Sequence, residues 1–227
     1  MSSNRREFIE HLGATAMLGA LPLTAMSPFL REAASGTPPA QGTWDLTWTS
    51  KLKGKKYKAC MDCTEVESGY GVWRASFWES QYQQTLGAKP AEIATVLVLR
   101  HNAIVLAFQQ SFWDTANIGA DAKVTHPVTL QSTDRNPALL SSSRNEIPAT
   151  FDAFALPNFM SRGGIVLACN LALEFFAAGY AQRANVAADE ARRRSVAALL
   201  PGVTLQPSGV FASLKAQDEG CNYLKAS

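Results

Sequence analysis

The sequence predicts an α/β domain in which a mostly parallel sheet carries helices on both faces. Two apolar runs without alternation, ATVLVL at Ala94–Leu99 and IVLA at Ile165–Ala168, are typical of strands that are covered on both sides. Stretches with the apolar spacing of helices separate the strand-like runs, and such alternation favours parallel strands joined by helices. The chain has 227 residues, of which 47% are hydrophobic, so it can fill the core of one such domain, about residues 43–227.

The first half of the domain contains one strongly patterned helix. Aromatic and aliphatic residues recur at helical spacing over Ser68–Leu86, and Gly87 and Pro90 end the pattern. The chain then turns polar between residues 117 and 143, which predicts a long surface excursion. The other elements expected here are strands at 56–61 and 94–99, a short helix at 107–114, and a short strand within the excursion at 124–130.

The second half of the domain alternates regularly between the two kinds of element. Gly163-Gly164 leads into the strand at 165–168, and a helical pattern starts directly behind that strand. We expect helices at 150–161, 170–181, 188–200 and 208–219, and further strands at 203–205 and 222–225. In sheets of this kind, ligands bind at the carboxyl ends of the strands.

The N-terminal segment differs in composition from the domain. The paired arginine Arg5-Arg6 precedes the weakly apolar stretch Leu12–Met26, an order that resembles a twin-arginine (Tat) export signal. We therefore expect a signal segment at residues 1–35, a flexible lead-in at residues 36–42, and a periplasmic protein. The apolar stretch is short and Pro22 interrupts it, so no stable membrane span is expected. A helix belonging to the mature protein is the alternative interpretation.

Composition and missing motifs exclude several classes of function. The net charge of +2 gives no sign of a nucleic-acid partner. The chain has neither a G-x-G-x-x-G nor a Walker pattern, and none of its serines lies in a G-x-S-x-G elbow. Cys169 and Cys221 do not form a second C-x-x-C pair, so no zinc site is expected. The sequence predicts neither a metal nor a cofactor.

Residues that can carry chemistry gather at the carboxyl ends of the predicted strands. Because these ends meet at one edge of a parallel sheet, a thiol, an imidazole, amides and the start of a helix are expected to converge there. The candidate catalytic residues are Cys169 and His101, and the candidate ligand-binding residues are Asn102, Asn170, Ser208 and Gly209.

Two interpretations of Cys169 stay open. Where a strand passes into a helix, the unpaired N–H groups and the positive end of the helix stabilise a thiolate and favour its reactivity. Alternatively, Cys169 is a small core residue, since free cysteines are among the most buried residues. His101 is equally open, because it either orients or deprotonates a reacting group or bonds a backbone carbonyl as a structural residue.

Cys60 and Cys63 form a C-x-x-C pair. Thr64 follows them where a haem attachment site would have histidine. A thioredoxin-type pair begins a helix, whereas Cys60 is expected to lie within a strand. We therefore favour a local disulfide between Cys60 and Cys63, or two unrelated thiols, over a catalytic pair.

Three long stretches carry a family resemblance: VLVLRHNAIVLAFQQSFWD, GGIVLACNLALEFF and LLPGVTLQPSGVFASLKAQDEGCNYLKA. They resemble the DsrE/DsrF-like family, and specifically its Tat-exported branch of unassigned role, within a match over most of residues 55–227. The resemblance implies a five-stranded sheet and a homo-oligomer. It also implies a persulfide on the cysteine that ends the central strand, a position that Cys169 matches. The C-x-x-C pair and Gln109-Gln110 depart from the pattern of the exported branch.

The resemblance favours a protein that carries or transfers sulfane sulfur. Cys169 would take sulfur from a donor, hold it as a persulfide and pass it to the thiol of a partner protein. His101, Asn170 and the helix start at Ser208-Gly209 would stabilise the anion. The alternative is a non-catalytic module that binds a small ligand or assembles into oligomers, with Cys169 as filler. A thiol–disulfide oxidoreductase that uses the C-x-x-C pair is the third hypothesis.

The paired arginine provides a test of export. We expect replacement of both Arg5 and Arg6 by lysine to block Tat translocation and to leave the full-length protein in the cytoplasm. Cell fractionation followed by immunoblotting measures the distribution. Unchanged accumulation in the periplasm would rule out the export signal.

Overall fold

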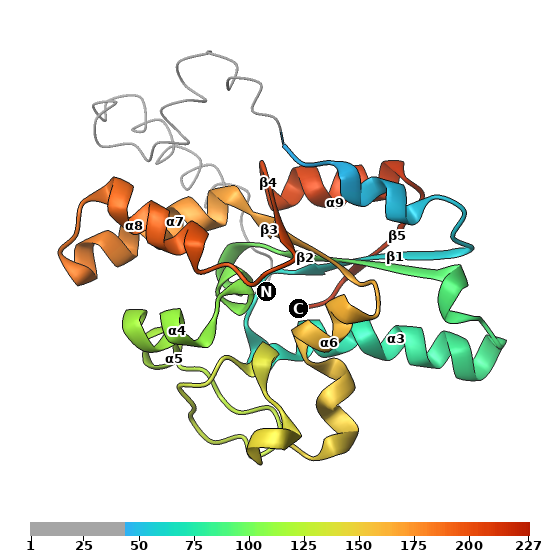
Figure 1. The fold of residues 1–227 in the computed structure, drawn as a ribbon, viewed down its shortest axis with the longest axis horizontal. Coiled ribbons are helices and arrows are strands. Elements are labelled where there is room, and N and C mark those ends of the chain that lie inside the picture. Colours follow the sequence, from blue (N-terminus) through green and yellow to red (C-terminus); the bar gives the residue numbers. More distant parts are fainter. Residues whose placement is uncertain (1–43) are drawn as a thin grey trace, which may run out of the picture. The chain divides into compact units, whose positions relative to one another are not determined.

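Five parallel strands form one sheet in the order β4-β3-β2-β1-β5 (Figure 1). The computed structural model describes residues 44–227. Its strands are β1 (Tyr57–Cys63), β2 (Ile93–Leu99), β3 (Ile165–Cys169), β4 (Val203–Gln206) and β5 (Asn222–Lys225). All neighbouring strands pair in parallel, which confirms the predicted fold class. The predicted signal segment at 1–35 and lead-in at 36–42 lie outside the described residues.

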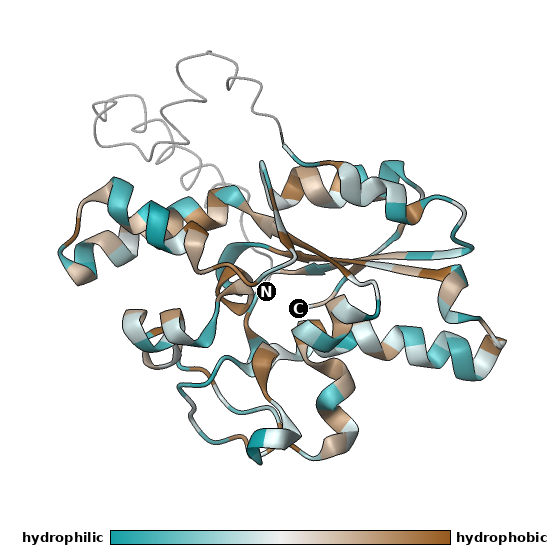
Figure 2. Cartoon of the chain, in the orientation of Figure 1, coloured by the Kyte–Doolittle hydropathy of each residue, from teal (hydrophilic) through white to brown (hydrophobic). Residues whose placement is uncertain are grey.

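The two unbroken apolar runs form the middle of the sheet. Every residue of β2 and β3 is buried, because helices cover both faces of the sheet at these strands. Figure 2 shows the hydrophobic character of these strands against the mixed surfaces of the outer helices. The edge strand β5 is exposed along its whole length. Two-sided burial thus accounts for the aliphatic sequence of β2 and β3.

One face of the sheet is covered by the helix α9 (Gly209–Asp218) and the short 3-10 helix η3 (Thr47–Leu52) (Figure 1). The Trp48 and Ala212 side chains of these helices pack with strand residues such as Val98 and Leu167 in one hydrophobic core. The helix η3 was not among the elements expected from the sequence. Its two buried residues, Trp48 and Leu52, complete the cover on this face.

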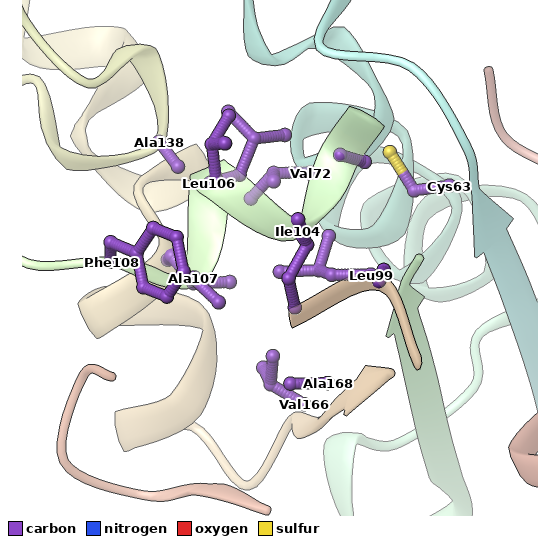
Figure 3. Close-up of a cluster of buried hydrophobic side chains, with 14 of the residues drawn as sticks. Cys63, Val72, Leu99, Ile104, Leu106, Ala107, Phe108, Ala138, Val166 and Ala168 are labelled. Carbon is purple, nitrogen blue, oxygen red and sulfur yellow. The ribbon is translucent and has the colours of Figure 1, made fainter. Parts of the chain in front are cut away.

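The other face carries a larger core beneath α3 (Tyr70–Leu86), α7 (Asn170–Ala184) and the 3-10 helix η6 (His101–Ala107). Figure 3 shows Leu99, Ile104 and Val166 within this core. The remaining helices are α4 (Gln110–Ala116), α5 (Ile118–Asp121), α6 (Leu156–Ser161), α8 (Ala188–Ala197) and the 3-10 turns η4 (Glu67–Gly69), η5 (Pro90–Glu92), η7 (Pro137–Leu139), η8 (Ser142–Arg144) and η9 (Ala149–Phe154). Within residues 44–227, the helices lack the combination of length and apolar character that a membrane crossing needs.

Three predicted elements differ in the structure. The segment 124–130 is not a strand, because its backbone turns around His126, whose ring Nδ1 accepts the N–H groups of Val128 and Thr129. The helix expected at 150–161 is broken at Ala155, which has an extended backbone with ψ of 141°. The helix expected from residue 107 begins at Gln110, because Gln109 is extended and donates its backbone N–H to the carbonyl oxygen of Ala198.

Of the two interpretations favoured for Cys60 and Cys63, a local disulfide or two unrelated thiols, the structure has the two separate thiols. Both residues are free thiols within β1. Successive side chains of a strand point to opposite faces, so residues three apart cannot face each other. Cys60 accordingly packs in the core under α9, and Cys63 packs in the core under α3. Figure 3 shows the Cys63 sulfur beside Val72 of α3.

The close approach of α3 to β1 depends on a glycine. A Cβ atom at Gly71 would overlap the Cys63 sulfur, so we expect Gly71→Ala to cost about 1–3 kcal/mol of unfolding free energy through overpacking. The matched control is Gly179→Ala in α7, where the new methyl meets only the flexible Arg183 guanidinium at 3.1 Å. That change is expected to stabilise the protein by about 0.5–1 kcal/mol through helix propensity.

Urea unfolding of the two single variants measures these costs. In a Cys63→Ala background, the cost of Gly71→Ala should shrink because the overlapping sulfur is gone. A cost that is unchanged in that background would show that the sulfur contact is not its cause.

Candidate functional site

A cleft of about 910 Å³ lies at the carboxyl ends of the central strands. The segments that follow β1 and β2 line one side of it, and the first turns of α7 and α9 line another. The cleft brings together five of the predicted site residues: Cys169, His101, Asn102, Ser208 and Gly209. The convergence expected at this edge of a parallel sheet is therefore present.

Cys169 occupies the junction between β3 and α7. It is the last residue of the strand and the N-cap of the helix, and its sulfur accepts the backbone N–H of Ala172 at 3.3 Å. The side chain is 6% exposed and lines the cleft. The first N–H groups of a helix have no partners within it, and the helix terminus carries partial positive charge. This position can therefore stabilise a negative charge on sulfur.

The other three cysteines lie in different environments. Burial raises the pKa of Cys60 to about 12 and the pKa values of Cys63 and Cys221 to about 11. Because the thiolate is the nucleophilic form, these three thiols are expected to be inert at neutral pH. The C-x-x-C pair consequently has no means of acting at this site, since both of its sulfurs point into the cores.

His101 and Asn102 meet a carboxylate that the sequence analysis did not single out as a site residue. The Asn102 amide donates to one oxygen of Glu65 at 2.7 Å, and the His101 Nδ1 atom lies 3.5 Å from the other. His101 has φ of 53°, so the chain makes a left-handed turn directly after β2. Among residues 44–227, no hydrogen bond joins His101 to Cys169; Cys169 bonds to Ala172 instead.

The lining residue Arg100 forms an ion pair with the buried Asp62, and we call this pair the floor of the cleft. Arg100 donates from Nε and Nη2 to the two carboxylate oxygens of Asp62, each at 2.7 Å. The Tyr223 hydroxyl donates to the same carboxylate at 2.7 Å. These hydrogen bonds to Asp62 raise the pKa of both Arg100 and Tyr223. The carboxylate, which is 1% exposed, is thereby matched by a charge and by three donors.

The start of α9 is shaped to fit Arg100. The Ser208 hydroxyl caps the helix by accepting the Phe211 N–H at 3.0 Å. A Cβ atom at Gly209 would overlap the Arg100 side chain, so glycine is required where the arginine crosses the helix start. Ser208 and Gly209 therefore shape the wall of the cleft.

Asn170 does not belong to the cleft. It is the first residue of α7, and its side-chain oxygen lies 3.5 Å from Nη2 of Arg192.

The sequence analysis did not predict the wall of the cleft that the later turns of α7 form. It contains Phe175 and Phe176 of α7 and the ion pair between Arg183 and Asp121, whose atoms are 3.1 Å apart. Helical spacing from Cys169 through residues 172 and 176 puts these positions on one face of α7, a signal that could have identified Phe176.

No cluster of three or more histidine, cysteine or acidic side chains occurs with metal-binding geometry in the part of the chain that the structure describes. Both arginines of the lining, Arg100 and Arg183, pair with carboxylates. The cleft offers a thiol at Cys169, an imidazole at His101 and several hydrogen-bond donors.

The ion pair in the floor is expected to contribute to stability. Asp62→Ala leaves Arg100 without its buried partner, and we expect a cost of about 3 kcal/mol, the low end for broken buried pairs because Arg100 is 30% exposed. The control is Asp121→Ala, which breaks a pair whose side chains are 48% and 40% exposed and should cost less than about 1 kcal/mol. Urea denaturation measures both, and equal costs would contradict this account of the floor.

Comparisons of this chain with protein-family models, with curated proteins and with solved structures found no match.

Proposed function

We propose that this chain is an exported DsrE/DsrF-like protein that carries sulfane sulfur as a persulfide on Cys169. One observation carries the proposal: of the four cysteines, Cys169 alone lines the cleft and caps a helix, while burial raises the pKa of the other three. The sequence resemblance points to the same residue, which ends β3, the neighbour of the middle strand β2.

The proposed step is a sulfur transfer between thiols. The Cys169 thiolate attacks the outer sulfur of a donor persulfide, R–S–SH, and a new S–S bond forms while the donor S–S bond breaks. The donor leaves as R–S⁻, and Cys169 becomes Cys–S–SH. The leaving thiolate takes its proton from the solvent. Attack by an acceptor thiolate on the outer sulfur then regenerates Cys169, so no net oxidation or reduction is needed.

Hydrogen-bond donors near Cys169 support this chemistry. The persulfide of a cysteine ionises to R–S–S⁻, and the N–H of Ala172 together with the other free donors of the first turn of α7 would stabilise that charge. The exported location and the donor or acceptor protein belong to the same proposal, because they rest on the Tat-like segment and the family resemblance.

The proposal includes a homo-oligomer. Large apolar side chains outside the cleft lining are exposed on α9, with Leu214 at 57%, and on the edge strand β5, with Leu224 at 52%. Exposed apolar side chains of this size are found on surfaces that bind a partner. This supports assembly through α9 and β5.

Alkylation and sulfur loading test the role of Cys169. We expect iodoacetamide at neutral pH to label Cys169 in the folded protein, and the persulfide of 2-mercaptoethanol to add one sulfur atom there, both measured by peptide mass spectrometry. Cys60, Cys63 and Cys221 are internal controls that should react only after denaturation, because burial raises their pKa values.

Cys169→Ser should lose both modifications while the protein stays folded, because serine is a favoured N-cap and can accept the same N–H group. Protection of Cys169 until the protein unfolds would overturn the proposal. That result would favour the alternative, a ligand-binding module in which Cys169 fills space.

A further inference from the structure

The charges around the cleft do not cancel, and the excess is negative. Glu67 pairs with Arg74 at 2.8 Å, and Asp121 pairs with Arg183 at 3.1 Å. The remaining arginine of the lining, Arg100, is held by Asp62, as described above. Each guanidinium of this region is thus matched by a carboxylate.

Glu65 is the carboxylate left over. Its side chain is 45% exposed and lines the cleft. Among residues 44–227, it has no arginine or lysine partner, and its contacts are the Asn102 amide and the His101 ring. Cys169 and Ser208 each accept one N–H group at the start of their helices, from Ala172 and Phe211 respectively. A negative charge on an incoming molecule would therefore meet Glu65, whose charge no arginine or lysine of residues 44–227 offsets.

The remaining surface of the cleft is apolar and large. Leu171, Phe175, Phe176 and Val210 line it together with Ile104 and Val105. Its volume of about 910 Å³ is that of pockets for organic molecules of drug-like size and is far larger than hydrosulfide or thiosulfate requires. Phe175 and Val210, which are 58% and 60% exposed, offer apolar surface to the body of such a molecule.

We propose that the cleft takes an organic persulfide with an apolar body and no negatively charged group in that body, and that Glu65 sets this selectivity. The inference rests on the proposed sulfur transfer to Cys169 and names its donor class. An apolar body gains from burial against Phe175 and Phe176, whereas a carboxylate or sulfonate on it is repelled by Glu65. A cationic group on the donor is attracted to the same carboxylate.

A matched series of small donors tests the charge selectivity. The persulfides of cysteamine, 2-mercaptoethanol and thioglycolate have similar size and carry a cationic, a neutral and an anionic group. At low ionic strength, we expect the cationic donor to modify Cys169 about tenfold faster than the anionic donor, with the neutral donor between them. The difference should shrink in high salt. Peptide mass spectrometry at successive times gives the rates.

Glu65→Gln should bring the cationic and anionic rates together, so the readout is the ratio of these two rates within each protein. The control is Glu92→Gln, which makes the same change of charge at the amino end of β2, about 20 Å from the carboxyl end by strand geometry. This control should preserve the tenfold difference. Circular dichroism of both variants establishes that they are folded.

The outcomes separate this inference from the function on which it rests. Equal rates for the three donors, or a difference that survives in Glu65→Gln, would overturn the selectivity while leaving sulfur transfer intact. Failure of all three donors to modify Cys169 would overturn both. A preference of about tenfold that is lost only in Glu65→Gln supports the assignment of Glu65.

Discussion

The buried carboxylate of Asp62 is the constraint on which the candidate site depends. A charged group that is 1% exposed destabilises a fold unless it is matched by an opposite charge and by donors. Arg100 supplies the charge from the end of β2, and Tyr223 supplies a further donor from β5. Arg100 in turn lies across the start of α9, where only glycine fits at position 209. One carboxylate in β1 thereby positions the elements that form the floor of the cleft.

Most of the fold follows from patterns that are local in the sequence. Two-sided burial leaves an unbroken aliphatic run, so β2 and β3 could be predicted within one residue of their ends. The edge of the sheet at which the site lies also follows, because parallel strands joined by helices share the orientation of their ends. Position at a strand end was therefore enough to bring Cys169, His101 and Ser208 into one cleft.

The features that sequence reasoning missed depend on contacts between distant residues or on side-chain direction. The charge of Glu65 is not offset by a nearby arginine, because Arg74 and Arg183 pair with other carboxylates. The pair of Arg183 with Asp121 joins distant parts of the chain, so no single segment of the sequence reveals it. Asn170 follows Cys169 directly, yet a helix turns successive side chains by about 100°, so it points toward Arg192 instead of the cleft. The C-x-x-C spacing suggested a disulfide, but the alternation of an extended strand separates its two sulfurs onto opposite faces of the sheet.

The four cysteines show how backbone position alone can assign different chemistry to one kind of side chain. A thiol inside β1 has a core on its side of the sheet, and loss of water makes its ionised form costly, which is why the pKa of Cys60 rises to about 12. At the last residue of β3, the chain passes into α7, and a sulfur there meets backbone N–H groups that the helix leaves free. The same edge of the sheet admits a ligand, because the connections diverge there. A parallel sheet thus offers a cysteine stabilising donors and access to a ligand together only at a strand end, and Cys169 has both.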